Sequence, residues 1–408
     1  MNQVTIPEIN WLVVGGAPRS GTTALGAALN ESADVALFHE YSSKVLFDAL
    51  TMLFSEEVRL RGQADFDRYE RLMPIRSRDE KAVSQAVFRA VFGKDARFIG
   101  TKFPGHHAWP QPSYPEWLGF REIHITRNPF DVVLSMLKKD HLHSASQSDV
   151  ENALYWWIHA WNHAVSRAGA ADFLNVFYDS LVTDHDGWHR KIGDFLGGLD
   201  DFSLSSFRST NHVVASERYA QEGLSDYLPL IECIARHDGW LADATADYAA
   251  KRKIGFPLRE GQDIDLCSGA NGWRYVDNGF YPAERDGAWT RGSHTSVLFT
   301  PEREYTGPVS LTVDIAWVAE HHGCGRDISV SIDGSTVFRS VVTLGSRNGS
   351  GMTLGIFVPE VTFKPRSTVS LQLQVFDPLN PHREGLGDDN RDLGIMVRKI
   401  SVSKLGTH

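Results

Sequence analysis

The sequence predicts an α/β domain with a parallel central sheet, followed by an all-β sandwich. The chain has 408 residues, which is long enough for two or three domains of ordinary size. Up to about Phe256, short apolar runs alternate with longer helical patterns, as is typical of α/β proteins. After Lys253, glycine, aspartate and serine become frequent and apolar residues alternate with polar ones, which indicates antiparallel strands.

The first domain is expected to span residues 1–258. Its expected strands are 11–14, 98–99, 122–125 and 174–177, and its expected helices include 22–29, 44–53, 81–91, 152–168 and 231–250. Functional residues of such folds lie at the carboxyl ends of parallel strands, so a site is expected in the segments that follow these strands.

The second domain is expected to span residues 265–408, as a sandwich of about 140 residues. Its expected strands include 310–316, 328–332, 367–376 and 394–402. Pro257, Gly261 and alternating charges make residues 256–265 the expected linker between the two domains.

The amino-acid composition indicates which binding partners and which cellular compartment are expected for the protein. A net charge of −10 disfavours generic binding to nucleic acids or anionic membranes, so an anionic ligand needs a local positive site. Three scattered cysteines without CxxC spacing support neither a disulfide framework nor a cysteine zinc site, which fits a reducing cytosol. With no signal-peptide pattern and no apolar run near 20 residues, a cytoplasmic protein without a membrane span is expected, and its oligomeric state is left open.

Residues 11–23 form the first motif, which predicts a strand, a turn of small residues and the start of a helix. Such a loop binds anions through free N–H groups and the helix dipole. A nucleotide triphosphatase has a lysine after the last glycine, but here Gly21 is followed by Thr22 and Thr23. ATP hydrolysis is therefore disfavoured, and Arg19 is the cation available for an oxyanion. The alternative is a tight glycine turn with no ligand.

Residues 123–135 form the second motif, another strand that passes into a helix. Asn128 fits the N-cap of that helix and Pro129 its first position. Arg127 leaves the carboxyl end of the strand and Ser135 lies on the helix, so the two are placed to hold a second phosphate. Without the first motif, Arg127 at this position would more typically form a structural ion pair.

Together the two motifs resemble the sulfotransferase family that uses 3′-phosphoadenosine 5′-phosphosulfate (PAPS). In that family a Pro-Arg-Ser-Gly-Thr-Thr type loop, here Pro18 to Thr23, holds the 5′-phosphosulfate. An Arg-x-Pro-x-Asp-x-x-x-Ser element, here Arg127, Pro129, Asp131 and Ser135, holds the 3′-phosphate. The resemblance covers roughly residues 11–255 and implies a P-loop-like fold, PAPS as sulfuryl donor and adenosine 3′,5′-bisphosphate (PAP) as product, with no metal.

The resemblance also assigns residues to the donor. Arg19 would compensate the charge of the phosphosulfate, and Tyr178 and Arg218 are weaker candidates because their surroundings depart from the family pattern. The residues implied to bind the donor are Arg19, Ser20, Gly21, Thr22, Thr23, Arg127, Ser135, Tyr178 and Arg218.

The same resemblance places a catalytic base just after the second strand, where two candidates stand together. Glu40 resembles the carboxylate base of Golgi-type glycan and tyrosine sulfotransferases, and His39 the imidazole base of the cytosolic small-molecule branch. Glu40 is the preferred base and His39 is the alternative. The third hypothesis is that neither is the base and that Glu40 is an ordinary solvated carboxylate. Lys102 matches a Gly-x-Lys-x-Pro element and would reach the sulfuryl group or the acceptor.

Metal binding is not expected from the linear pattern. His106, His107, His141 and His143 lack the spacing of a ligand set, and the oxygen-rich segment 387–392 lacks the EF-hand pattern, so it is expected to form a hydrogen-bonded turn. On a predicted helix, Tyr155, Trp156, Trp157 and Trp161 are expected to pack in the core.

The acceptor is expected to be a hydroxyl group, most readily on a glycan. The second domain weakly resembles sandwich modules attached to some bacterial glycosyltransferases, and Trp273, Tyr275, Trp289 and Trp317 are candidates to stack on sugar rings, with core packing as the alternative. Two other functions stay open: sulfation of a small phenol, lipid or peptide tyrosine, and a non-catalytic nucleotide-binding scaffold.

Overall fold

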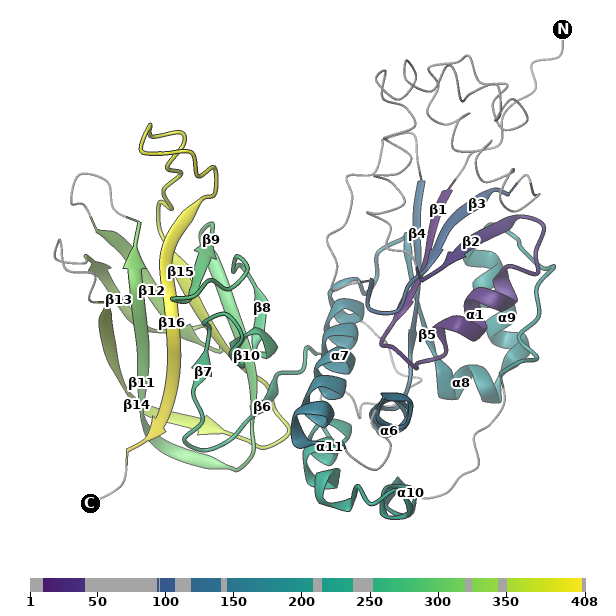
Figure 1. Ribbon diagram of the computed structural model, residues 1–408, viewed down its shortest axis with the longest axis horizontal. Coiled ribbons are helices and arrows are strands. Elements are labelled where there is room, and N and C mark those ends of the chain that lie inside the picture. The colour runs from purple at the N-terminus through teal and green to yellow at the C-terminus, as the bar shows by residue number, and fades with distance from the viewer. Residues whose placement is uncertain are drawn as a thin grey trace, which may run out of the picture. The chain divides into compact units, whose positions relative to one another are not determined.

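The structure is a computed structural model, and it describes residues 10–40, 94, 96–106, 119–140, 145–207, 215–237, 252–319, 325–343 and 351–405. The chain divides into two compact units, one of Met1–Ile231 with Asp243–Lys251 and one of Glu232–Ala242 with Arg252–His408 (Figure 1). The first is an α/β unit, and the second consists of β-sheets together with the end of one helix at residues 232–235, so the predicted fold class is confirmed. The expected helices 44–53 and 81–91 lie outside the described residues.

A five-stranded, all-parallel sheet forms the centre of the first unit, in the order β2-β3-β1-β4-β5. Its strands are β1 (Asn10–Gly16), β2 (Val35–His39), β3 (Phe98–Lys102), β4 (Gly119–Thr126) and β5 (Phe173–Phe177). The central strand β1 is apolar and buried on both faces, which is what a parallel strand covered by helices on two sides requires.

Helices cover both faces of this sheet, with α1, α8 and α9 on one side and α6 and α7 on the other (Figure 1). The helices described in the chain are α1 (Thr22–Leu29), α6 (Pro129–Asp140), α7 (Gln147–Ser166), α8 (Tyr178–Thr183), α9 (His185–Phe195), α10 (Ala215–Gln221) and α11 (Leu228–Ala235). None of the described helices is both long and apolar enough to cross a membrane.

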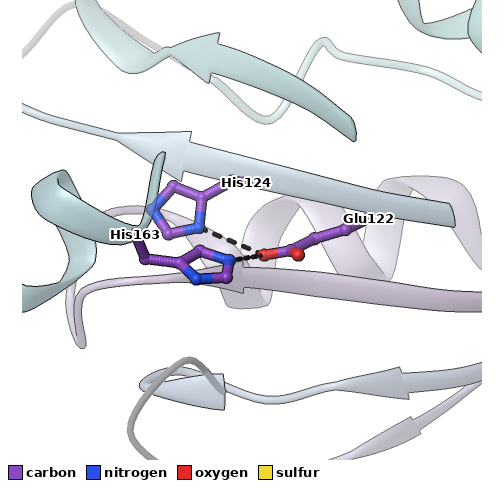
Figure 2. A group of neighbouring side chains, drawn as sticks. All are labelled: Glu122, His124 and His163. Carbon is purple, nitrogen blue, oxygen red and sulfur yellow. Dashed lines mark hydrogen bonds and ion pairs between the residues drawn. The ribbon is translucent and has the colours of Figure 1, made fainter. Parts of the chain in front are cut away.

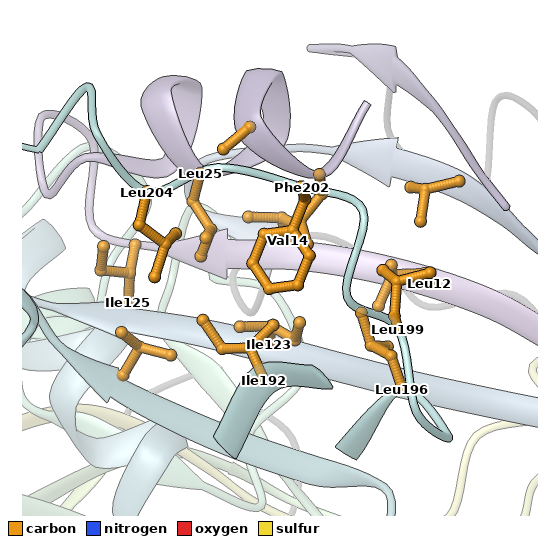
Figure 3. Close-up of a cluster of buried hydrophobic side chains, with 14 of the residues drawn as sticks. Leu12, Val14, Leu25, Ile123, Ile125, Ile192, Leu196, Leu199, Phe202 and Leu204 are labelled. Carbon is orange, nitrogen blue, oxygen red and sulfur yellow. The ribbon is translucent and has the colours of Figure 1, made fainter. Parts of the chain in front are cut away.

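The core beneath α1 and α9 is built from alternate residues of the strands. Leu12 and Val14 of β1 and Ile123 and Ile125 of β4 point to the same face and pack with Leu25 of α1 (Figure 3). The residues between them on each strand therefore face α6 and α7.

Local capping explains where the helices on that second face begin. The Asn128 side chain accepts a hydrogen bond from the Phe130 N–H at 2.9 Å, which confirms the predicted start of α6. Ser146 and Asp149 form a capping box at the start of α7, which begins five residues before the predicted 152. Trp157 and Trp161 of α7 are buried and stacked, so the predicted core role of these two residues is confirmed.

Two mainly antiparallel sheets make up the second unit. One has the order β13-β12-β15-β10-β6 with β8 beside β10, and the other β14-β11-β16-β7 with β9 beside β16. The strands are β6 (Phe256–Leu258), β7 (Ile264–Asp265), β8 (Val276–Asn278), β9 (Ala288–Arg291), β10 (His294–Pro301), β11 (Tyr305–Val318), β12 (Arg326–Ile332), β13 (Ser335–Val342), β14 (Met352–Phe363), β15 (Val369–Val375) and β16 (Leu393–Lys404).

The segment expected to be a linker carries strands instead. Residues 256–258 form β6, which pairs in parallel with β10, and residues 264–265 form β7, which pairs with β16. The tyrosine Tyr275 is buried, and its hydroxyl donates to the Pro257 carbonyl at 3.1 Å. The all-β unit thus begins before the predicted residue 265, because short strands rich in proline and glycine resemble a linker in the sequence.

Candidate active site

The carboxyl ends of all five parallel strands lie along one edge of the sheet, and each end leads into a residue predicted for the site. Glu40 follows β2, Lys102 ends β3, Arg127 follows β4 and Tyr178 follows β5. The loop predicted to bind an anion, residues 17–21, follows β1 at the centre. The sheet therefore gathers side chains that are far apart in the sequence, as expected for an open α/β fold.

The loop after β1 shapes a backbone turn around the start of α1. Gly21 is the N-cap residue and has a φ of 105°, and a Cβ there would lie 3.0 Å from the Tyr178 ring. Arg19 also takes a left-handed conformation, with a φ of 69°. The Ser20 hydroxyl is buried and has no hydrogen-bond partner among the described residues, so it is available to a ligand in the loop.

A lysine joins three of the strand ends at this site. The Lys102 ammonium nitrogen lies 3.0 Å from the Thr23 hydroxyl and 2.9 Å from Glu40 Oε1. Lys102 is buried, whereas 58% of the Glu40 side chain is exposed. The predicted base and the predicted cation are therefore in direct contact, beside the first turn of α1.

Each partner changes the acidity of the other. The hydrogen bond and the positive charge of Lys102 hold the pKa of Glu40 below its usual value. Burial lowers the pKa of Lys102, and the bond to Glu40 partly opposes that effect. Glu40 is thus ionised at neutral pH, and it keeps one carboxylate oxygen that Lys102 does not occupy.

Two backbone features hold this pair in place. The Glu40 N–H donates to the Lys102 carbonyl at 2.7 Å, and Glu40 takes a left-handed φ of 63°. A Cβ at Gly26 of α1 would lie 2.9 Å from Lys102 Cβ, so only glycine lets the lysine stem pass along the helix. His39, the alternative base, is exposed at the end of β2.

The second motif forms a cluster of two arginines around one carboxylate. Asp131 on α6 accepts from Arg127 at 3.4 Å and, through its other oxygen, from Arg218 of α10. The Arg127 guanidinium lies 4.3 Å from the centre of the Tyr178 ring, and its Nε is buried without a partner among the described residues. Asp179 also lies within electrostatic reach of Arg127 and Asp131, so the two guanidinium groups face two carboxyl groups. The unpartnered Nε of Arg127 still offers a charged donor to a phosphate.

The two motifs contact each other. Arg19 Nε donates to the Ser135 hydroxyl at 3.1 Å, so the arginine of the first loop reaches the helix of the second motif. Tyr178 links them from the other side, because its ring lies under Arg127 and against Gly21. The predicted donor-binding residues therefore form one continuous site at the sheet edge.

The sequence comparison agrees with this arrangement. Residues 12–201 match the model of the sulfotransferase family. The resemblance to sulfotransferases predicted from the two motifs is therefore confirmed, and the matched segment contains all the predicted site residues except Arg218. No curated protein matches the chain at a significant level.

Several solved structures are similar to parts of the chain. The sulfotransferase domain of the Synechococcus PCC 7002 olefin synthase is 18% identical, over 47% of this chain and 74% of that one, with a TM-score of 0.28. Mouse sulfotransferase SULT7A1 complexed with PAP is 15% identical, over 54% of this chain and 63% of that one, with a TM-score of 0.26. A family 35 carbohydrate binding module from an environmental isolate is 15% identical, over 37% of this chain and 88% of that one, with a TM-score of 0.20.

Some contacts of the first unit could not be predicted from the sequence. Trp157 of α7 donates to the Arg127 carbonyl at 2.8 Å and so positions the end of β4. The pairing of Arg218 with Asp131 spans 87 residues, and no spacing rule predicts it. The sequence did predict that Trp157 is buried on a helix, but its bond to the Arg127 carbonyl depends on the tertiary fold.

In the second unit, the oxygen-rich turn is held by arginine. Asp389 and Glu284 each accept from Arg391 at 2.8 Å, so these carboxylates are paired with a guanidinium, as expected of a hydrogen-bonded turn. A cavity of about 600 Å³ lies nearby in the same unit, with a mostly polar lining that includes Asn278, Tyr281, Arg291, His294, Asn390 and Asp392.

Proposed function

We propose that this protein transfers a sulfuryl group from PAPS to an acceptor hydroxyl. The observation that carries the proposal is the contact of Lys102 with both Thr23 of the anion-binding loop and Glu40, at 3.0 and 2.9 Å. It places a buried cation between the predicted phosphosulfate loop and an ionised, accessible carboxylate. Sulfuryl transfer needs these two elements: positive charge for the transferring group and a base for the acceptor proton.

The residues at the sheet edge fit the proposed donor. Ser20 Oγ and Arg127 Nε are buried polar atoms without partners among the described residues, and both belong to the motifs assigned to its phosphates. We assign the 5′-phosphosulfate to residues 19–23 and the 3′-phosphate to Arg127 and Ser135, with Arg218 adding positive charge. When bound, PAPS supplies the sulfuryl group.

The remaining steps belong to residues of this chain. Glu40 accepts the proton of the acceptor hydroxyl through its exposed carboxylate. The Lys102 ammonium stabilises negative charge that develops on the sulfuryl oxygens and on the leaving phosphate oxygen. Since Glu40 and Lys102 lie beside the donor loop, a purely non-catalytic scaffold is the weaker hypothesis.

The pH dependence of kcat/KM distinguishes the two candidate bases. Glu40 must be ionised and its pKa lies below the usual 4.5, so activity is expected to stay level from neutrality down to about that pH. Lys102 must be protonated, so activity falls as the pH rises through a pKa below the usual 10.5. An acid limb between neutrality and pH 4.5, together with loss of turnover in His39→Gln, would transfer the role to His39.

We propose a glycan as the acceptor. The polar cavity of the second unit combines amide, carboxylate and guanidinium groups with Tyr281, whose ring lies 5.7 Å from the Arg291 guanidinium carbon. Such a lining offers hydrogen bonds to sugar hydroxyls and one aromatic surface. Trp273 and Trp317 are also exposed, at 40% and 44%, whereas Tyr275 is in the core. Phenols, lipids and peptide tyrosines are the alternative acceptors.

A further inference from the structure

Three ionisable side chains meet on the face of the sheet opposite α1, the face that α6 and α7 cover. Glu122 and His124 come from β4, and His163 comes from the last turn of α7 (Figure 2). Glu122 Oε1 lies 2.8 Å from His163 Nε2 and 3.5 Å from His124 Nδ1. Glu122 and His124 are almost fully buried, and 23% of the His163 side chain is exposed.

The donor atoms of this cluster suit a divalent cation. One carboxylate oxygen of Glu122 lies in contact with a ring nitrogen of each histidine. Carboxylate oxygens and imidazole nitrogens are ligands that zinc and other first-row divalent metals take in proteins.

The distances within the cluster match those between metal ligands. In a tetrahedral zinc site with bonds of about 2.0–2.1 Å, neighbouring ligand atoms lie about 3.3 Å apart. The two measured separations, 2.8 and 3.5 Å, fall on either side of that value, and one ligand atom from each of the three residues lies within 4.8 Å of the other two.

The backbone of β1 leaves room above the carboxylate. A Cβ at Gly15 would lie 3.4 Å from Glu122 Oε1, 3.6 Å from His124 Nδ1 and 3.7 Å from His106 Cβ. His106 thus lies next to the three ligands. A tetrahedral metal ion held by those three would take its fourth ligand from the His106 ring or from a water molecule.

We propose that Glu122, His124 and His163 bind one first-row divalent metal ion, with zinc the ion that fits their donor set best. The expectation of no metal rested on linear spacing and considered His106 but none of these three residues, whereas this set is assembled by the fold from β4 and α7. The ion would tie β4 to α7, the helix whose Trp157 also binds the Arg127 carbonyl. The proposal does not depend on sulfuryl transfer.

The test is a titration of chelator-treated protein with Co²⁺, which reports a tetrahedral site by its visible absorption, followed by displacement with Zn²⁺. Full-length protein is expected to bind one equivalent at this site, and His163→Gln is expected to bind at least about tenfold more weakly. His189→Gln is the matched control, because His189 is also a half-buried helical histidine and contacts the Phe202 carbonyl at 3.0 Å. This control is expected to bind as the wild type does.

Unfolding temperatures measured with and without Zn²⁺ provide a second test of metal binding. At a fixed Zn²⁺ concentration, the ion is expected to raise the unfolding temperature of the wild type and of His189→Gln equally, and that of His163→Gln by less. The proposal is overturned if the wild type binds no ion, which would make the cluster a proton-sharing network only. It is equally overturned if His163→Gln keeps the cobalt spectrum, because the ion would then bind elsewhere.

Discussion

Glu40→Gln is expected to lower turnover by about 10²–10⁴-fold while PAP affinity stays close to that of the wild type. Glutamine keeps the size of the side chain and its hydrogen-bonding oxygen toward Lys102, but it cannot accept the acceptor proton. Glu40 lies on the exposed side of the Lys102 contact and is not among the residues assigned to the nucleotide. Steady-state rates measured with PAPS, together with calorimetry of PAP binding, separate the two effects.

His39→Gln is the matched control for this variant, because His39 is the exposed neighbour on the same strand end. It is expected to retain most of the turnover. The reverse pattern, in which Glu40→Gln is fully active and His39→Gln is not, would show that Glu40 is only the ion-pair partner of Lys102.

Arg127→Ala is expected to weaken PAP binding by about 2–5 kcal/mol, which corresponds to roughly 30-fold to several thousand-fold. The Arg127 side chain is only 12% exposed and its Nε has no partner among the described residues, so a 3′-phosphate would receive a largely desolvated charge. Asp131 keeps its bond to Arg218 in this variant, which limits the damage to the fold.

Selectivity between nucleotides shows whether the lost contact is the predicted one. The wild type is expected to bind PAP far more tightly than AMP or ATP, and Arg127→Ala is expected to lose most of that difference, because AMP and ATP lack the 3′-phosphate. Arg121→Ala, on the same strand but outside the site, serves as control. Equal affinity of the wild type for PAP and AMP in calorimetry would contradict the assignment of Arg127.

Local patterns were sufficient to predict much of the first unit. The expected helix 22–29 is observed with the same bounds, and the four expected strands lie inside β1, β3, β4 and β5. The start of α6 was also predicted, because Asn128 and Pro129 satisfy requirements that depend only on neighbours in the chain. The predicted carboxyl ends of the strands were then sufficient to predict the edge of the sheet at which the site residues lie.

Contacts across the fold could not be predicted in the same way. The sequence assigned Arg19 and Ser135 to separate phosphates, yet the structure joins them at 3.1 Å. Glu122 and His124 are two residues apart on one strand, but their partner His163 is brought in by the packing of α7 on the sheet. Such juxtapositions depend on helix placement, which hydrophobic periodicity does not specify.

The central claim is tested most directly by incubating the full-length protein with PAPS and a panel of glycans, phenols and peptides, followed by mass spectrometry of the products. The account predicts an acceptor that gains one SO₃ group with release of one PAP, with a glycan as the best substrate and about 10²–10⁴-fold slower product formation by Glu40→Gln. A product from phenols or peptides alone would correct the acceptor class. No sulfated product from any acceptor, by a protein that binds PAP, would contradict the proposed sulfuryl transfer.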